Sequence, residues 1–222
     1  IAEWIANGWL QSYDGADDDG ILPLMAIDLA NKGKIRPVLD YRELNKHVTS
    51  HTGQSDVCDE SLRRWRRFGE NVTMLDLRKA YLQIHVQTDL WEFQNVKFRG
   101  KLYCLTRLGF GLNVAPKIMS AIVNRVLSLR GDIKEATDSY IDDIIVNTEV
   151  VEISDVVAHL IRYGLEVKVP EKFDSSRVLG LQIFKDARGR HWRRGNEIPE
   201  VGPHEKITRR ELFSLCCQLV GH

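Results

Sequence analysis

Apolar and polar residues alternate with a period of two in several short segments of the chain, which predicts β-strands there. Residues 21–29 and 34–41 form one expected hairpin, because Asn31-Lys32-Gly33 between them is a turn sequence. Residues 80–86 fit a helix or a strand. The other predicted strands are at residues 72–77, 94–98, 102–105, 165–169, 178–184 and 190–194, with 94–98 and 102–105 joined as a second hairpin.

Other segments repeat their apolar residues with the period of a helix. Pro116 opens a helix with a wide apolar stripe, and Gly131 is expected to end it. Residues 151–163 form a second amphipathic helix that stops at Gly164. Further helices are predicted at residues 1–10, with a stop at Asn7-Gly8, at 55–68, and from the capping box that begins at Thr208. Hairpins mixed with helices, without regular strand–helix alternation, predict an α+β fold with an antiparallel sheet.

The composition excludes few functions. The 222 residues are 43% hydrophobic and 28% charged, as in an ordinary soluble globular protein. No apolar run approaches a membrane span of roughly 18 residues, and no signal peptide opens the chain. The four cysteines have neither metal-site nor disulfide spacing, so we expect reduced thiols and an intracellular location. The first residue is Ile1 rather than Met, and we expect a piece of a larger polypeptide.

The net charge of +0 gives no overall attraction to nucleic acid. Any such binding must come from local basic patches or from bound metal. The pairs Arg63-Arg64 and Arg66-Arg67 are one such patch, and they are compatible with a phosphate contact or with a solvated helix face.

Two adjacent carboxylates, Asp142 and Asp143, lie between Tyr140 and the β-branched residues 144–146. This pattern predicts a strand, a two-residue turn and a second strand. At the tip of such a hairpin both carboxylates can converge, and two close carboxylates repel unless a cation lies between them. Mg²⁺ is the cation that this donor set suggests. An isolated Asp-Asp pair is more often a solvated turn, but the apolar flanks indicate a buried sheet, where carboxylates are costly without a purpose.

A third carboxylate, Asp76, ends the apolar strand predicted at residues 72–77. This position suits a metal ligand that faces Asp142 and Asp143 from a neighbouring strand. By position alone, a helix N-cap is an equally good interpretation of Asp76. Three carboxylates at two strand ends would give a site for two metal ions, the arrangement expected for nucleotidyl transfer.

Five segments resemble, in order, the motifs of reverse transcriptases from LTR retrotransposons and retroviruses. Residues 36–45 resemble the fingers motif, 75–83 the first catalytic block, and 108–116 the segment that lines the nucleotide pocket. Tyr-Ile-Asp-Asp at residues 140–143 resembles the catalytic box, and residues 178–180 resemble the primer grip. The resemblance implies an RNA-directed DNA polymerase with right-hand fingers and palm, an antiparallel palm sheet backed by helices, and a truncated thumb.

The resemblance also assigns the site residues by matching position. Asp76, Asp142 and Asp143 would be the catalytic, metal-binding triad for two Mg²⁺ ions, with Mn²⁺ as a substitute. The backbone carbonyl of Leu77 would be a further metal ligand. The implied dNTP contacts are Lys34, with Lys32 as the alternative, Arg36, Tyr81, Phe110 and Gly111. The implied primer and template contacts are Tyr140, Ile141, Leu179 and Gly180.

Several of these residues have an expected role. The guanidinium of Arg36 suits a triphosphate, and the ring of Tyr81 would exclude a 2′-hydroxyl, although a core tyrosine is an alternative interpretation. Phe110 stands where retroviral enzymes often have Gln and many retrotransposon enzymes have Phe. Gly111 would allow close approach of the chain, and Ile141 would touch the primer end.

The implied domains are fingers at residues 1–70, a palm at 71–184 with a fingers insertion near 87–115, and the palm end with the start of a thumb at 185–222. The implied partners are an RNA and DNA primer-template, dNTPs, and the protease, RNase H and integrase domains of a pol polyprotein. Nothing in the chain resembles the RNase H or protease domains. The expected locations are the cytoplasm, virus-like particles and the nucleus. No membrane partner is expected. Two alternatives are an RNA-dependent RNA polymerase and a decayed or domesticated copy that binds nucleic acid without synthesis.

Overall fold

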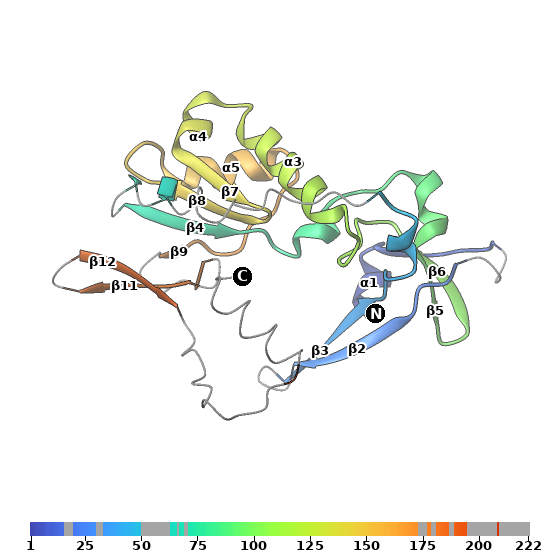
Figure 1. Ribbon diagram of the computed structural model, residues 1–222. Helices are drawn as coiled ribbons and strands as arrows, with labels where there is room; N and C mark the ends of the chain where they lie inside the picture. Colours follow the sequence, from blue (N-terminus) through green and yellow to red (C-terminus); the bar gives the residue numbers. More distant parts are fainter. Residues whose placement is uncertain are drawn as a thin grey trace.

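The computed structural model describes residues 1–15, 20–29, 33–49, 63–65, 67–68, 71–172, 177–178, 181–186, 189–194 and 208, and the structural statements below concern these residues. Helices and antiparallel sheets are mixed along the chain, so the expected α+β fold class is confirmed (Figure 1). Within this part of the chain, no helix combines the length and the apolarity needed to cross a membrane.

A four-stranded antiparallel sheet in the order β7-β8-β4-β9 carries the predicted carboxylates. Its strands are β4 (Val72–Asp76), β7 (Thr137–Tyr140), β8 (Asp143–Asn147) and β9 (Glu171–Lys172). Helices α3 (Ala115–Leu127) and α5 (Ile153–Arg162) pack on one face of this sheet, and α4 (Gly131–Ala136) leads into β7 (Figure 1).

The two faces of this sheet have different cores. Leu75 and Ile144 face the helices and join a cluster with residues of α3 and α5. Met74 and Ile145 belong to a smaller cluster around the fully buried Trp65. Because side chains alternate between the faces of a strand, the carboxylates that end β4 and begin β8 lie on the face away from the helices.

A second region is built around smaller sheets. Strands β1 (Leu10–Ser12), β6 (Lys101–Leu105) and β5 (Asn95–Phe98) form one sheet, and β2 (Leu24–Leu29) pairs with β3 (Lys34–Leu39) as a hairpin. Helix α1 (Ala2–Ala6) and the 3-10 helices η2 (Leu44–Lys46) and η4 (Thr88–Gln94) complete this region. Its core contains Leu10, Leu22, Leu39, Tyr41, Val96 and Leu105.

A further sheet of three strands follows, along the chain, the sheet that carries the carboxylates. Its strands are β10 (Arg177–Val178), β11 (Leu181–Asp186) and β12 (Gly189–Arg194). The strand predicted at 190–194 is confirmed within β12. The single strand predicted at 178–184 is wrong at its start, because Val178 belongs to β10, which pairs antiparallel with β11, and β11 begins at Leu181. Leu179, Gly180, most of the helix predicted at 55–68 and the helix expected after Thr208 lie outside the described residues.

Both predicted hairpins and the helices that start near Pro116 and Val151 are confirmed, and three local predictions need correction or refinement. Gly131 does not end α3, because α3 already ends at Leu127. Gly131 instead begins α4, and the extended backbone of Arg130 separates the two helices. Residues 165–169 form no strand but one isolated bridge, between Val167 and Leu77. Residues 80–83 form a 3-10 helix, η3 (Ala80–Gln83), which follows a left-handed Lys79.

Candidate active site

The sheet register brings the predicted carboxylates to one end of β4 and β8. Asp76 is paired directly with Asp143, and Tyr140 pairs with Asp143 from the other side. Asp142 lies in the turn between β7 and β8, and its carbonyl accepts a 3.4 Å hydrogen bond from the amide of Leu77. The end of β4 is thus tied to the β7–β8 turn by backbone geometry.

The turn itself is strained at one residue. Ile141 has a φ of +58°, in the left-handed region that β-branched residues rarely adopt. Its side chain is partly buried against the core on the helix side of the sheet, so packing offsets the strain. A two-residue turn with positive φ at its first central position matches the right-handed twist of the strands, and it projects Asp142 beyond the end of β8.

The three carboxylates interact electrostatically. Burial is the main cause that raises the pKa of Asp142, and the negative charge of Asp76 adds to it. Burial, together with the charges of Asp142 and Asp76, raises the pKa of Asp143 to about 6. Lys168 opposes both shifts, because its ammonium forms an ion pair with Asp76.

These side chains fit a hard divalent cation chemically. Carboxylate oxygens are its preferred ligands. A cation would relieve both causes that raise the pKa of Asp143, the burial of its charge and the repulsion by Asp142 and Asp76. In the conformation described, however, no group of three or more His, Cys, Asp or Glu side chains in the described part of the chain has the spacing of a metal site. One oxygen of Asp76 is engaged by Lys168 instead.

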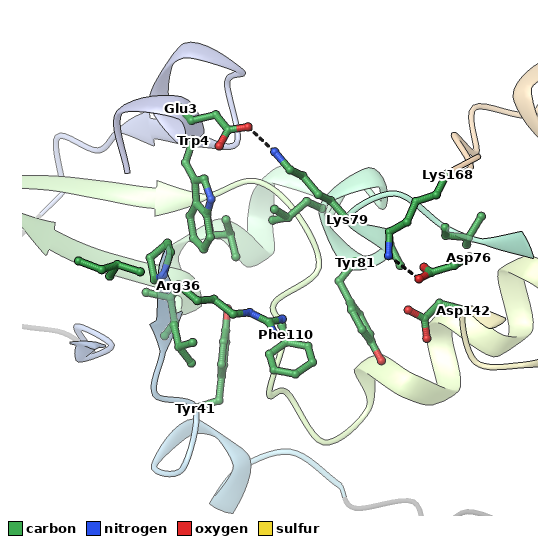
Figure 2. Close-up of a pocket in the computed structure, with 18 residues that line it drawn as sticks. Glu3, Trp4, Arg36, Tyr41, Asp76, Lys79, Tyr81, Phe110, Asp142 and Lys168 are labelled. Atoms are coloured by element: carbon green, nitrogen blue, oxygen red, sulfur yellow. Dashed lines mark hydrogen bonds and ion pairs between the residues drawn. The ribbon is translucent and has the colours of Figure 1, made fainter. Parts of the chain in front are cut away.

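A cavity of about 480 Å³ opens beside these carboxylates. Asp76, Asp142 and Lys168 line one end, and Arg36 lies toward the other (Figure 2). Between the two ends lie the aromatic rings of Tyr81 and Phe110 (Figure 2). A cavity with anionic groups at one end and a guanidinium at the other suits an elongated, charged ligand.

The aromatic groups in this cavity contact one another. The guanidinium carbon of Arg36 lies 4.6 Å from the ring centroid of Phe110, a cation–π contact. The ring of Tyr81 meets Phe110 edge-on, with centroids 5.6 Å apart and planes at 70°. Burial and, to a smaller extent, the nearby charge of Asp142 raise the pKa of Tyr81.

The turn that carries Phe110 is held by a buried pair. The hydroxyl of Tyr41 donates to the side-chain oxygen of Gln94 at 2.8 Å. The side-chain nitrogen of Gln94 donates in turn to the carbonyls of Leu105 and Arg107. A Cβ at Gly109 would lie 1.8 Å from the Tyr41 hydroxyl. The close approach of the chain that was expected at Gly111 therefore occurs at Gly109 instead.

Gly111 is needed for a different reason. A Cβ there would meet its nearest atom, in Tyr41, at the ordinary distance of 3.4 Å, but the φ of Gly111 is +107°, which favours glycine. Asn45 fixes the same turn from outside, because its side chain donates to the carbonyl of Gly111 at 2.9 Å and accepts from the amide of Asn113 at 2.8 Å.

The N-terminal helix contributes residues that the sequence did not single out. Glu3 and Trp4 line the cavity, and Glu3 forms an ion pair with Lys79 (Figure 2). The ammonium of Lys79 also lies 4.7 Å from the ring centroid of Trp9. The sequence did not single out Lys79, Lys168 or Tyr41 either. Nothing in the local pattern distinguishes the two lysines from surface charges, or Tyr41 from a core aromatic residue.

The predicted site residues are therefore only partly gathered. The cavity brings together Asp76, Leu77, Asp142, Arg36, Tyr81 and Phe110. Tyr140 and Asp143 do not line it. Tyr140 packs with the cluster around Trp65, on the same face of the sheet as Asp76 and Asp143. Of Lys34 only the backbone is described, and Leu179 and Gly180 lie outside the described residues.

Several known proteins are similar to this chain. A family model described as "Reverse transcriptase (RNA-dependent DNA polymerase)" matches residues 27–172. The chain is 27% identical over 165 residues to the Pro-Pol polyproteins of simian foamy virus type 1 and of simian foamy virus type 3 (strain LK3). Each match covers 71% of this chain and 14% of the polyprotein.

A solved structure is also similar in fold. The foamy viral protease-reverse transcriptase, solved in complex with dsDNA, matches 99% of this chain with a TM-score of 0.70 and 22% identity. That match covers 46% of the solved chain. The present chain thus spans less than half the length of the relatives that it matches.

Proposed function

Because this chain belongs to the reverse transcriptase family, as the match over residues 27–172 shows, we propose that it is the fingers and palm of an RNA-directed DNA polymerase. It adds deoxynucleotides to a primer 3′-hydroxyl on an RNA or DNA template. One observation carries the proposal: Asp76 is paired with Asp143, next to Asp142 in the turn, at one end of a cavity that leads to Arg36.

The domain boundaries follow the same proposal. Residues 1–70 are part of the fingers, 71–184 are the palm with a fingers insertion near 87–115, and 185–222 lead into the thumb. The palm sheet is then β7-β8-β4-β9, backed by α3 and α5. The relatives are polyproteins, so protease, RNase H and integrase domains are proposed partners in the full-length protein.

Members of this family generally use divalent metal ions. In this chain, Asp76, Asp142, Asp143 and the carbonyl of Leu77 are the proposed ligands, and Mg²⁺ is the proposed ion. When bound, two such ions activate the primer hydroxyl and stabilise the charge on the leaving pyrophosphate. The chain's own contribution is to hold the carboxylates at two adjacent strand ends, where the register fixes their separation.

The residues along the cavity have proposed roles toward the nucleotide. Arg36 binds the triphosphate, and its stacking on Phe110 orients the guanidinium before the nucleotide arrives. Tyr81 lies beneath the sugar, and its ring, held edge-on against Phe110, leaves no room for a 2′-hydroxyl. Lys34 and Gly111 complete the proposed dNTP contacts.

The primer and template contacts remain those that the resemblance implies. Ile141 stands at the tip of the β7–β8 turn, where a primer terminus would approach Asp142. Tyr140, Leu179 and Gly180 are proposed to support the primer from the same side. These four assignments follow from motif position.

Primer extension tests the proposal directly. An oligo(dT)-primed poly(rA) template with Mg²⁺ and dTTP should be extended by the parent chain. Asp142→Asn should abolish extension and retain duplex affinity, because the fold keeps the turn while one metal ligand is lost. Asp89→Asn is the matched control, since Asp89 lies in η4 and outside the lining of the cavity; it should extend as the parent does.

Two other outcomes would redirect the interpretation. Duplex binding without extension by the parent would support a copy that binds nucleic acid without synthesis. Preferential extension with UTP over dTTP would support an RNA-dependent RNA polymerase.

A further inference from the structure

The segment after α5 is fixed beside β4 by its backbone. The amide of Lys168 donates to the carbonyl of Asp76 at 2.8 Å, and the amide of Arg78 donates to the carbonyl of Glu166 at 2.9 Å. These two bonds enclose the isolated bridge between Leu77 and Val167. The Cα of Lys168 therefore has a defined place next to Asp76, whatever its side chain does.

The ammonium of Lys168 faces the carboxylates. It forms an ion pair with one oxygen of Asp76 and lines the same cavity as Asp142 (Figure 2). Its positive charge acts on Asp142 and Asp143 as well as on its direct partner. The side chains of Lys168 and Asp76 are 51% and 36% exposed, so the ammonium can leave this position for solvent.

We propose that Lys168 is a built-in counter-ion, which occupies the carboxylate site when no divalent metal is bound and must be displaced from Asp76 when one binds. This inference rests on the proposed function, because it takes Asp76, Asp142 and Asp143 as metal ligands. An ammonium has no lone pair to offer a metal, and at contact distance it repels a divalent cation. The two cations therefore compete for the Asp76 oxygen.

The competition accounts for two features of this site. Three carboxylates stay close together because Lys168 offsets part of their repulsion. They also lack the spacing of a metal site among the described residues, because one Asp76 oxygen points to the ammonium rather than to a shared centre. Removing the charge of Lys168 should therefore favour metal binding in the absence of nucleotide.

Direct Mn²⁺ binding to the whole 222-residue chain tests this, with the free ion followed by electron paramagnetic resonance at low salt and without nucleotide. Lys168→Met should bind Mn²⁺ about tenfold more tightly than the parent, the order expected for removing a unit charge a few Å from a divalent ion. Lys168→Arg, which keeps the charge, should stay near the parent. Lys134→Met, on the exposed side of α4, is the matched control and should change nothing.

A second measurement uses the unaltered chain and does not depend on the folding of a variant. Acetylation of lysines, located by mass spectrometry, should increase at Lys168 when Mn²⁺ is added, because displacement frees its ammonium. Acetylation at Lys134 should be independent of Mn²⁺. Unchanged labelling of Lys168 in a sample that binds Mn²⁺ would overturn the inference.

The outcomes separate this inference from the proposed function. If neither the parent nor Lys168→Met binds Mn²⁺, the three-carboxylate metal site itself is wrong. If both bind with equal affinity, the metal site stands and the counter-ion role of Lys168 is wrong. Tighter binding by Lys168→Met, but not by Lys168→Arg, would establish the role.

Discussion

Gly109 is the position where the smallest change should have the largest effect on the candidate site. A Cβ at this residue would lie 1.8 Å from the hydroxyl oxygen of Tyr41, 2.2 Å from its Cζ, and 2.7 Å from the side-chain oxygen of Gln94. Tyr41 is only 2% exposed, so it has no open space to move into. Gly109→Ala must therefore displace a buried ring or the backbone beside Phe110.

The expected loss of stability has two parts. Displacing the ring breaks the 2.8 Å hydrogen bond from Tyr41 to Gln94, and a buried polar group left without a partner costs about 1–3 kcal/mol. Overpacking of a filled core costs about 1–3 kcal/mol more. The free energy of unfolding should fall by about 2–6 kcal/mol, a large share of the roughly 5–15 kcal/mol that is typical of a domain.

Urea denaturation of the parent and the variant measures this loss. Gly131→Ala is the matched control, because a Cβ there meets nothing within 4 Å and the backbone is helical; it should be neutral or slightly stabilising. In a Tyr41→Leu background, which lacks the clashing hydroxyl and Cζ, the added cost of Gly109→Ala should fall by at least about 1 kcal/mol. Equal stability of Gly109→Ala and the parent would refute the packing argument.

Two further predictions concern the cavity and its carboxylates. Tyr81→Ala should raise the use of UTP relative to dTTP by about tenfold or more in kcat/KM, because the ring that excludes the 2′-hydroxyl is lost; an unchanged ratio would remove Tyr81 from this role. The pKa of Asp143 is raised to about 6 from its ordinary 3.8, so the metal-free folded chain retains a proton that the unfolded chain releases, and stability in EDTA should fall as pH rises from about 4 to about 6. Asp143→Asn should flatten that part of the curve, and a slope that persists in the variant would assign it to another group.

Much of the secondary structure was predictable because its signals are local. The run of apolar residues in 72–77 identified β4, and the Arg99-Gly100 turn between two apolar runs identified the β5–β6 hairpin, where both residues have positive φ. The failures were also local. Gly131 predicts a helix stop, yet it is the first residue of α4, and only the extended Arg130 before it distinguishes the two cases.

The candidate site was predictable as far as its motifs extend. Asp142 and Asp143 are consecutive, and Asp76 ends a recognisable strand, so the carboxylates were found without the structure. The sheet register pairs Asp76 with Asp143, but Asp143 is the first residue of β8, so only Asp142 lies in the turn where both carboxylates were expected.

The sequence by itself determined which short segments form strands and helices, and which residues carry the carboxylates. It could do so because each of these features depends on neighbours within a few positions. Only the tertiary structure decided that Lys168 reaches Asp76 across 92 positions of the chain. It also decided that Tyr41 bonds Gln94 across 53 positions, so that Gly109 cannot carry a side chain. Such partners meet through packing of distant elements, and no local periodicity of apolar residues records them.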